Sequence, residues 1–352
     1  MLRRSLAALA LFAALAVPAA AQQKTDFRVA WSIYVGWMPW GYLAESGIMD
    51  RWAEKYGISV EIVQINDYVE SINQYTAGAF DGVTATNMDT LSIPAGGGVD
   101  TTALIVGDYS DGNDALIVKG GGTIADLKGQ RVNLVELSVS HYLLARALDS
   151  AGLAERDLAA VVNTSDADMI AAFATPDVTA VVTWNPLVST ILETPGATKL
   201  FDSADIPGEI IDLMVVNTET LAANPDFGRA LVGAWYELMA LMTSGTPEGE
   251  AALTAMAEAS GTDLAGYRAQ LASTRMFWTP AEAVAFAADP ALKQTMVSVA
   301  GFLFDKGILG EGAPGPDFVG VAYPDGGVTG DPANVKFRFD TTFMAMAADG
   351  AL

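Results

Sequence analysis

The sequence contains no cysteine and a single histidine, His141, in 352 residues. Without cysteine the chain can form no disulfide and carry no lipid on an N-terminal cysteine, so its stability must come from a buried core. Basic residues are also scarce, because 19 Lys and Arg stand against 42 Asp and Glu, a formal net charge of −23. Such a field repels nucleic acid and anionic membrane surfaces and attracts small cations, although solubility alone also accounts for many surface acids.

Motifs for catalysis and for cofactors are absent as well. The sequence has no HExxH, no P-loop and no complete dinucleotide fingerprint, and it lacks a GxSxG elbow and any His/Cys cluster with metal-ligand spacing. A lone histidine with no nucleophile beside it is expected to cap or pack within its own helix. We therefore predict no catalytic residue, no metal site, no cofactor and no enzymatic activity.

The first 21 residues have the pattern of a secretory signal. Arg3 and Arg4 form a basic start, an apolar run covers Leu6 to Val17, and small residues lead up to Ala21. The apolar run is too short to span a bilayer. We predict cleavage after Ala21 and a periplasmic, soluble protein that is not lipid-anchored.

Alternating strand and helix signals dominate the first two hundred residues. Short apolar runs predict strands over 27–31, 58–65, 83–87, 101–106, 114–119, 131–135, 159–163, 178–184 and 212–216. Helical periodicity lies between them, over 40–56, 67–78, 140–152 and 166–175. This order predicts an α/β fold with mostly parallel sheets. After residue 217 the pattern predicts helices over 225–245, 248–261 and 290–307, then a Gly- and Pro-rich surface loop with one strand.

Ligands of open α/β sheets bind beyond the carboxyl ends of the strands, so the residues found there are the candidate site. They combine carboxylates, amides and tryptophans with no Lys or Arg: Trp37, Trp40, Asp67, Asn87, Asp89, Glu136, Ser138, Trp184, Asn185 and Asp212. Asp67, Asp89 and Glu136 stand near helix starts, where an anion would otherwise bind. Indole faces and carboxylates together favour a guanidinium or an ammonium ion.

Several of these residues also have purely structural interpretations. Asp67 stands at capping-box spacing from Glu70, and Asp89 can equally cap a helix or be solvated. Trp184 can pack in the core, and the tryptophans of the first loop can form a small core of their own. Glu136 follows an apolar strand, so we expect it to be buried and to need a partner.

The order of three segments resembles periplasmic solute-binding proteins of the nitrate/sulfonate/taurine family of ABC importers. They are WSIYVGWMPWGYLAESGIMDRWAEKYGISVEIVQ (31–64), TAGAFDGVTATN (76–87) and TIADLKGQRVNLVELSVSHYLLARAL (123–148). The resemblance implies a two-lobed, type II periplasmic binding protein with its ligand in the cleft between the lobes. It places one lobe over 22–112 and 217–352 and the other over 113–216, with crossings near 110–113 and 215–217. It also implies a monomer that delivers ligand to a membrane permease.

Within that family, VGWMPWGYL (35–43), INDYVESINQYTAG (65–78) and TATNMDTL (84–91) are similar to the branch associated with urea-carboxylase gene clusters. The ligands suggested for that branch are urea and guanidine. Glu136 stands where sulfonate binders offer polar donors, which favours the guanidinium cation. We expect Trp37 or Trp40 to stack on it, Glu136 and Asp212 to accept its N–H groups, and Asn87 or Asn185 to orient it.

Other functions remain open at this level. Urea or another small amine or amidine is an alternative ligand for the same class of transporter. A thiamine-pyrimidine-synthase-like enzyme shares the two-lobed scaffold, but only His141 could serve as its site histidine and its cysteine cluster is missing. A receptor module that presents its ligand to a sensor is the third alternative.

Overall fold

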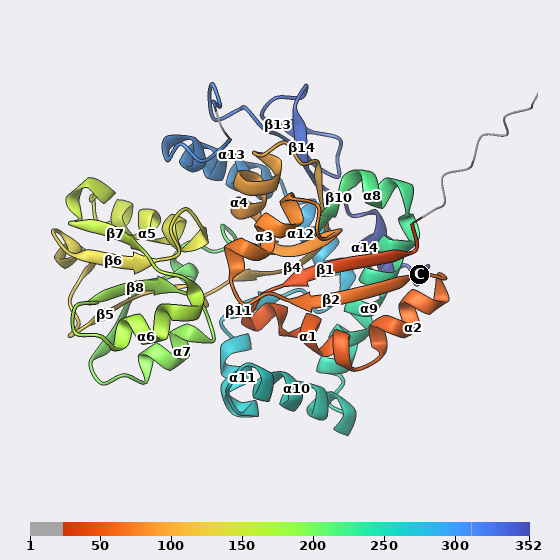
Figure 1. The fold of residues 1–352 in the computed structure, drawn as a ribbon, viewed down its shortest axis with the longest axis horizontal. Coiled ribbons are helices and arrows are strands. Elements are labelled where there is room, and N and C mark those ends of the chain that lie inside the picture. The colour runs from red at the N-terminus through yellow and green to blue at the C-terminus, as the bar shows by residue number, and fades with distance from the viewer. Residues whose placement is uncertain (1–23, 311) are drawn as a thin grey trace, which may run out of the picture.

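The computed structural model describes residues 24–310 and 312–352, and the predicted signal segment 1–21 lies outside them. The described chain forms two lobes side by side, each built around one sheet (Figure 1). Lobe 1 comprises residues 24–110 and 211–352, and lobe 2 comprises residues 115–202. Two short crossings, 111–114 and 203–210, join the lobes.

The sheet of lobe 1 has nine strands in the order β13-β12-β14-β4-β10-β3-β1-β2, with β11 paired to β4. Their bounds are β1 (Asp26–Trp31), β2 (Ser59–Gln64), β3 (Gly82–Thr86), β4 (Thr101–Ser110), β10 (Ile211–Asn217), β11 (Thr274–Met276), β12 (Gly320–Ala322), β13 (Val328–Thr329) and β14 (Val335–Phe339). Lobe 2 has five strands in the order β7-β6-β8-β5-β9. These are β5 (Ala115–Lys119), β6 (Arg131–Leu134), β7 (Ala160–Asn163), β8 (Ala180–Thr183) and β9 (Ala197–Asp202).

Helices cover both sheets, and most of them belong to lobe 1 (Figure 1). Lobe 1 contains α1 (Met38–Glu45), α2 (Ile48–Lys55), α3 (Tyr68–Thr76), α4 (Asn87–Thr90), α8 (Thr218–Ala223), α9 (Pro225–Thr243), α10 (Pro247–Ala259), α11 (Leu264–Leu271), α12 (Pro280–Ala287), α13 (Pro290–Asp305) and α14 (Thr342–Ala348). Lobe 2 contains α5 (Val139–Ser150), α6 (Met169–Ala174) and α7 (Leu187–Leu192). No helix in the described ranges is long and apolar enough to cross a membrane.

The two-lobed α/β prediction is confirmed, but both sheets are mixed rather than mostly parallel. β1 runs parallel to β2 and β3, whereas β10 is antiparallel to both of its neighbours, β3 and β4. In lobe 2, β5 is antiparallel to β8 and β9. The reason is the double crossing: β4 leaves lobe 1 and β10 re-enters it, so the two strands lie side by side in opposite directions.

The structure differs from the sequence prediction in the end of the second crossing and in the number of strands near the C-terminus. All of β10 belongs to the sheet of lobe 1, so the second crossing ends at residue 210 instead of near 215–217. The Gly- and Pro-rich stretch that we expected to hold one strand holds β12, β13 and β14. β12 and β13 have only three and two residues, too few for a hydrophobic period to stand out from the turns around them.

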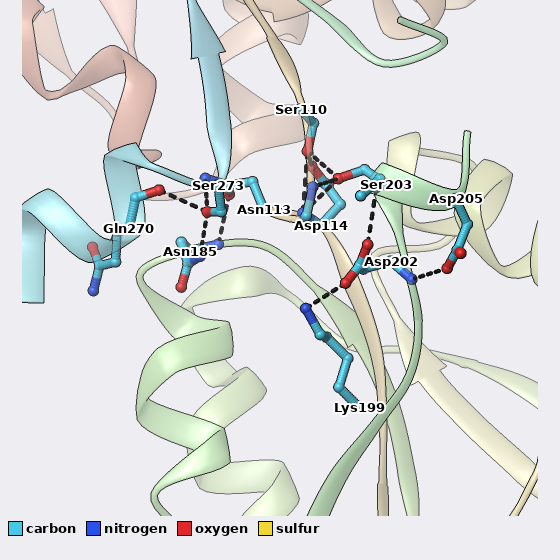
Figure 2. Close-up of polar contacts among 12 residues, drawn as sticks. Ser110, Asn113, Asp114, Asn185, Lys199, Asp202, Ser203, Asp205, Gln270 and Ser273 are labelled. Atoms are coloured by element: carbon cyan, nitrogen blue, oxygen red, sulfur yellow. Dashed lines mark hydrogen bonds and ion pairs between the residues drawn. The ribbon is translucent and has the colours of Figure 1, made fainter. Parts of the chain in front are cut away.

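The two crossings are bonded to each other (Figure 2). The Ser110 hydroxyl donates to Asp114 Oδ2 at 2.6 Å and lies 2.6 Å from the Ser203 hydroxyl. Ser203 also accepts the Gly112 N–H at 2.8 Å. Ser203 starts the return crossing, Ser110 ends β4, and Gly112 and Asp114 belong to the outward crossing, so these bonds fix how the lobes are joined.

Replacing Ser203 with Ala should lower the free energy of unfolding by about 1–3 kcal/mol, because the buried Gly112 N–H loses its acceptor. Urea unfolding followed by circular dichroism measures this. The control is Ser150→Ala, which removes a hydroxyl that bonds only a helix carbonyl, Ala147 O, and should cost less. Equal stability of Ser203→Ala and the unaltered protein would show that the crossings are held by other contacts.

Candidate functional site

Four aromatic rings form a cage between the lobes. Tyr34 and Trp37 come from the loop after β1, Tyr68 starts α3, and Trp184 follows β8 in lobe 2. The rings of Trp37 and Tyr34 meet edge-on, with their centroids 5.0 Å apart. The Tyr68 ring has its centroid 5.6 Å from that of Trp37 and 5.6 Å from that of Trp184. All four are at least 95% buried. Aromatic faces gathered in this way provide the negative surfaces to which cations are attracted.

Four aspartates lie in and behind this cage, and each is at least 97% buried: Asp89, Asp108, Asp114 and Asp212. Asp114 and Asp212 line the cavity directly, together with Thr86, Val139 and Ile210. None of the described residues that line it is Lys, Arg or His. Buried carboxylates without a cationic partner are costly, so this arrangement points to a positive ligand or to protonation.

Hydrogen bonds from the protein satisfy only part of this group. Asp89 Oδ2 accepts from the Tyr68 hydroxyl at 2.7 Å, from Thr86 Oγ1 at 2.9 Å and from the Val139 N–H at 3.3 Å. Asp108 Oδ1 accepts from the Tyr34 hydroxyl at 2.8 Å. One oxygen each of Asp89, Asp108 and Asp212 is buried with no partner.

Burial raises the pKa of every carboxyl in the group. The pKa of Asp89 rises to about 6, and those of Asp108 and Asp114 rise to about 7, in each case chiefly through desolvation. The pKa of Asp212 rises well above its usual value, through burial and then through the nearby Asp108 and Asp114. These carboxyls therefore titrate near neutral pH unless a positive charge joins them.

The lobes are closed on each other around the cage. Trp184 Nε1 donates to Ile33 O at 3.1 Å, and the Val35 N–H donates to Asn185 O at 3.2 Å. The bond from Val139 to Asp89 is a third link between the lobes. The cavity left between them measures about 10 Å³, close to the space of one water-sized sphere. Entry of any ligand therefore requires the lobes to separate.

The structure brings together some of the residues predicted from the sequence. Trp37, Trp184 and Asp212 line the cavity, and Asp89 stands directly behind Tyr68 and Thr86.

Glu136 is not buried, contrary to expectation, because the chain turns outward after β6 and leaves its side chain exposed. The carboxylate that meets the start of α5 is instead Asp89, from the other lobe. Asp67 is also exposed and caps α3 by accepting the Glu70 N–H at 2.9 Å. Both acids line a separate hollow of about 260 Å³ between the lobes.

Trp40 lies in the core of lobe 1, stacked on Trp235 with centroids 5.0 Å apart, because it falls inside α1 on the buried face. The polar candidates serve the backbone. Asn87 accepts the Ile211 N–H, and Ser138 caps α5. Asn185 accepts the Ser189 N–H and bonds Ser273, so none of these three lines the cavity.

His141 lies outside the cage, in a groove of about 560 Å³ between α5 and α13. Its Nε2 is 3.1 Å from Glu155 Oε2, and Nδ1 accepts the Leu137 N–H. Burial and the nearby Lys306 lower its pKa to about 4. The described ranges contain no group of three side chains arranged to hold a metal ion.

Four residues of the site were not predicted: Tyr34, Tyr68, Asp108 and Asp114. Both tyrosines fall inside the segments 31–64 and 65–78 that carry the family resemblance. No sequence pattern indicated that their side chains face the cleft. Asp114 is the last residue of the outward crossing, directly before β5, where the chain passes the cleft. Asp108 lies within β4 opposite Asp212, a pairing that only the strand register reveals.

Comparison with known proteins identifies the family to which this chain belongs. A family model described as NMT1/THI5 like matches residues 51–237. The chain belongs to the NMT1/THI5-like family. A putative binding protein of Brucella abortus is 26% identical over 205 residues, which is 57% of this chain and 63% of that protein. A putative aliphatic sulfonates-binding protein of Escherichia coli is 42% identical over 84 residues, 24% of this chain and 26% of its own.

Solved structures similar to this NMT1/THI5-like chain share its fold. The alkanesulfonate-binding protein SsuA of Xanthomonas axonopodis, bound to MOPS, superposes with a TM-score of 0.66 at 18% identity over 83% of this chain and 96% of its own. SsuA of Escherichia coli gives 0.65 at 21% identity, covering 81% and 94%. The nitrate-binding protein NrtA of Synechocystis gives 0.57 at 13% identity, covering 94% and 99%. These matches confirm the periplasmic binding protein fold.

Gly36 of this NMT1/THI5-like chain is required by the close approach of Asp108. A Cβ at Gly36 would lie 2.6 Å from Asp108 Oδ2 and 2.5 Å from the Tyr34 ring. We expect Gly36→Ala to lower the free energy of unfolding by about 1–3 kcal/mol through this overpacking. Thermal unfolding measures it. The control is Gly301→Ala in α13, where a Cβ meets nothing within 4 Å and should stabilise the helix by about 0.5–1 kcal/mol. A Gly36→Ala protein of unchanged stability would mean that Asp108 is free to move.

Proposed function

We propose that this protein is the substrate-binding component of an ABC importer and that it captures a small planar cation, guanidinium. The observation that carries the proposal is the aromatic cage around buried carboxylates with no basic side chain in its described lining. Family membership and the shared fold support the transport role. Under this proposal the protein acts in the periplasm as a monomer and delivers its ligand to a permease.

The charge of the cage argues against an anionic ligand. The similar solved structures include proteins named for binding alkanesulfonates and nitrate. A sulfonate or nitrate in this cavity would lie against Asp114 and Asp212 without a guanidinium or ammonium group to balance it. Anion sites use such groups or helix N-termini. Three helices start at the cavity, α3 at Tyr68, α4 after Thr86 and α5 at Val139. Each already donates a first-turn N–H within the protein: α3 to Asp67, α4 to Thr86 Oγ1 and α5 to Asp89.

Guanidinium fits the remaining chemistry. It is flat, permanently charged at physiological pH, and offers N–H groups around its edge to carboxylates. Asp114 comes from the outward crossing and Asp212 from β10, so the two can accept from different edges of one ligand. Trp37 and Trp184 supply flat faces from opposite lobes. The small cavity favours guanidinium over longer amines, because less separation of the lobes is needed.

Ligand-induced thermal stabilisation tests the proposal. Guanidinium at low millimolar concentration should raise the melting temperature, because a ligand present at 100 times its Kd stabilises the folded state by about 2.7 kcal/mol. Sodium chloride of equal ionic strength is the control for salt. Urea is the neutral match in size and shape, and taurine is the anionic alternative. A shift with urea or taurine but none with guanidinium would overturn the choice of ligand.

Variants distinguish the carboxylates of the cage from the exposed acids near the cleft. Asp114→Asn should weaken guanidinium binding about ten- to a hundredfold, because a hydrogen bond between charged groups is worth about 1.5–3 kcal/mol. Glu136→Gln also removes one negative charge but from an exposed site, and it should change the affinity less than about twofold. Calorimetric titration measures both. Greater loss with Glu136→Gln than with Asp114→Asn would move the site outward, away from the cage.

A further inference from the structure

Asp108 and Asp212 form a pair of carboxyls on neighbouring strands. They are directly opposite each other in the antiparallel register of β4 and β10, and both are at least 98% buried. Side chains at such positions have Cβ atoms about 4.5–5.5 Å apart and share one face of the sheet. Asp212 lines the cavity, whereas Asp108 lies behind it. Any change of charge on Asp108 therefore reaches the ligand through Asp212.

Without a bound cation, a proton shared between the two carboxyls supplies the donor that the oxygens of this pair lack. Asp108 Oδ1 accepts the Tyr34 hydroxyl, while Asp108 Oδ2 and Asp212 Oδ2 are buried without any donor among the described residues. The pKa values agree with this arrangement, since burial raises both and each carboxyl interacts with the other. Gly36 packs so closely on Asp108 Oδ2 that a Cβ at this position would lie 2.6 Å from that oxygen. A polar side chain therefore cannot replace the glycine and donate a hydrogen bond to Asp108.

The groups that face the pair are acidic or neutral on every side. Tyr34 approaches from the loop after β1, Asp114 from the crossing and Tyr267 from α11, and all three interact electrostatically with one or both carboxyls. Thr274 of β11 lies 3.4 Å from the Tyr34 hydroxyl. Burial raises the pKa of both tyrosines far above neutral, so they remain uncharged. The proton of the pair thus has no competing base other than the neighbouring aspartate.

We propose that Asp108 determines charge specificity at the ligand site by holding, with Asp212, a proton that is released when a cation enters. This rests on the proposed function. Without ligand, the shared proton keeps one negative charge fewer in the buried cage. A cation beside Asp212 favours the ionised form, so the proton leaves to solvent and the net charge of the site is conserved. Urea brings no charge, leaves the proton in place and gains no such exchange.

Linkage fixes the direction of the pH effect. A cation that displaces one proton binds about tenfold more weakly for each pH unit below the pKa of the pair, and its affinity levels off above that pKa. Guanidinium affinity should therefore rise as the pH is raised from about 5.5, because burial raises the pKa of both carboxyls, and it should flatten above the pKa of the pair. Binding of urea, where it can be measured, should change little over the same range.

Calorimetric titration of the full-length mature protein with guanidinium chloride measures the released protons directly. Titrations at pH 6 in phosphate and in a zwitterionic buffer of different ionisation enthalpy should give binding enthalpies that differ by the heat of about one proton. Both buffers are brought to the same sodium concentration, so competition from the buffer cation is equal in the two titrations. The same titrations at a pH above the pKa of the pair should show a much smaller difference.

The variant Asp108→Asn removes the shared proton while its amide can still donate to Asp212. It should lower the number of protons released at pH 6 by about one and make the pH profile of guanidinium affinity shallower, with the remaining slope due to Asp89 and Asp114. Asp177→Asn, at an exposed position in lobe 2, is the charge-matched control and should behave like the unaltered protein. Thermal unfolding checks that both variants are folded, and the two-buffer titration of the unaltered protein tests the proposal without any variant.

The outcomes separate the two proposals. Guanidinium binding with no proton release and no pH dependence would overturn the proton exchange and leave the proposed ligand intact. Proton release that persists unchanged in a folded Asp108→Asn protein would also overturn it, because another group would be the source. Absence of guanidinium binding at every pH would overturn the proposed function, and the exchange with it.

Discussion

The cost of burying negative charge without a positive partner governs the centre of this structure. Four aspartates are buried between the lobes, and the cavity they surround has no basic residue in its described lining. Each ionised carboxylate removed from water costs several kcal/mol unless it is paired or protonated. Tyrosine and threonine hydroxyls offset part of that cost for Asp89 and Asp108, but one oxygen of each has no partner. A bound cation, or protons in its place, completes the balance.

The same carboxylates link the ligand site to the junction between the lobes. Asp114 lines the cavity and also accepts the Ser110 hydroxyl, which in turn meets Ser203 at the start of the return crossing. Asp89 of lobe 1 accepts the N–H of Val139 in lobe 2. A ligand that changes the charge state of Asp89 therefore acts on a contact between the lobes, and one that changes the charge state of Asp114 acts on the bonds of the crossings that join them. Closure around a ligand by hinge motion is a common response in two-lobed proteins.

The sequence was sufficient for the fold class and for the chemical character of the site, and it was weaker on individual positions. Apolar strands such as 83–87 and 131–135 were long enough to be recognised, whereas β12 and β13, with three and two residues, were too short. Trp37, Trp184 and Asp212 were found because they follow or begin strands. Glu136 was misplaced because strand ends predict which loop faces the cleft, not which way each side chain turns. Asp108 escaped because its partner is set by the register of strands a hundred residues apart.

A crystal structure of the protein with guanidinium bound, at a resolution that distinguishes a planar three-nitrogen group, shows directly whether a cation occupies the aromatic cage. The account predicts the cation inside the aromatic cage, with nitrogens about 2.7–2.9 Å from oxygens of Asp114 and Asp212. A sulfonate or other anion held in the cage, or guanidinium found only outside it, would contradict the account.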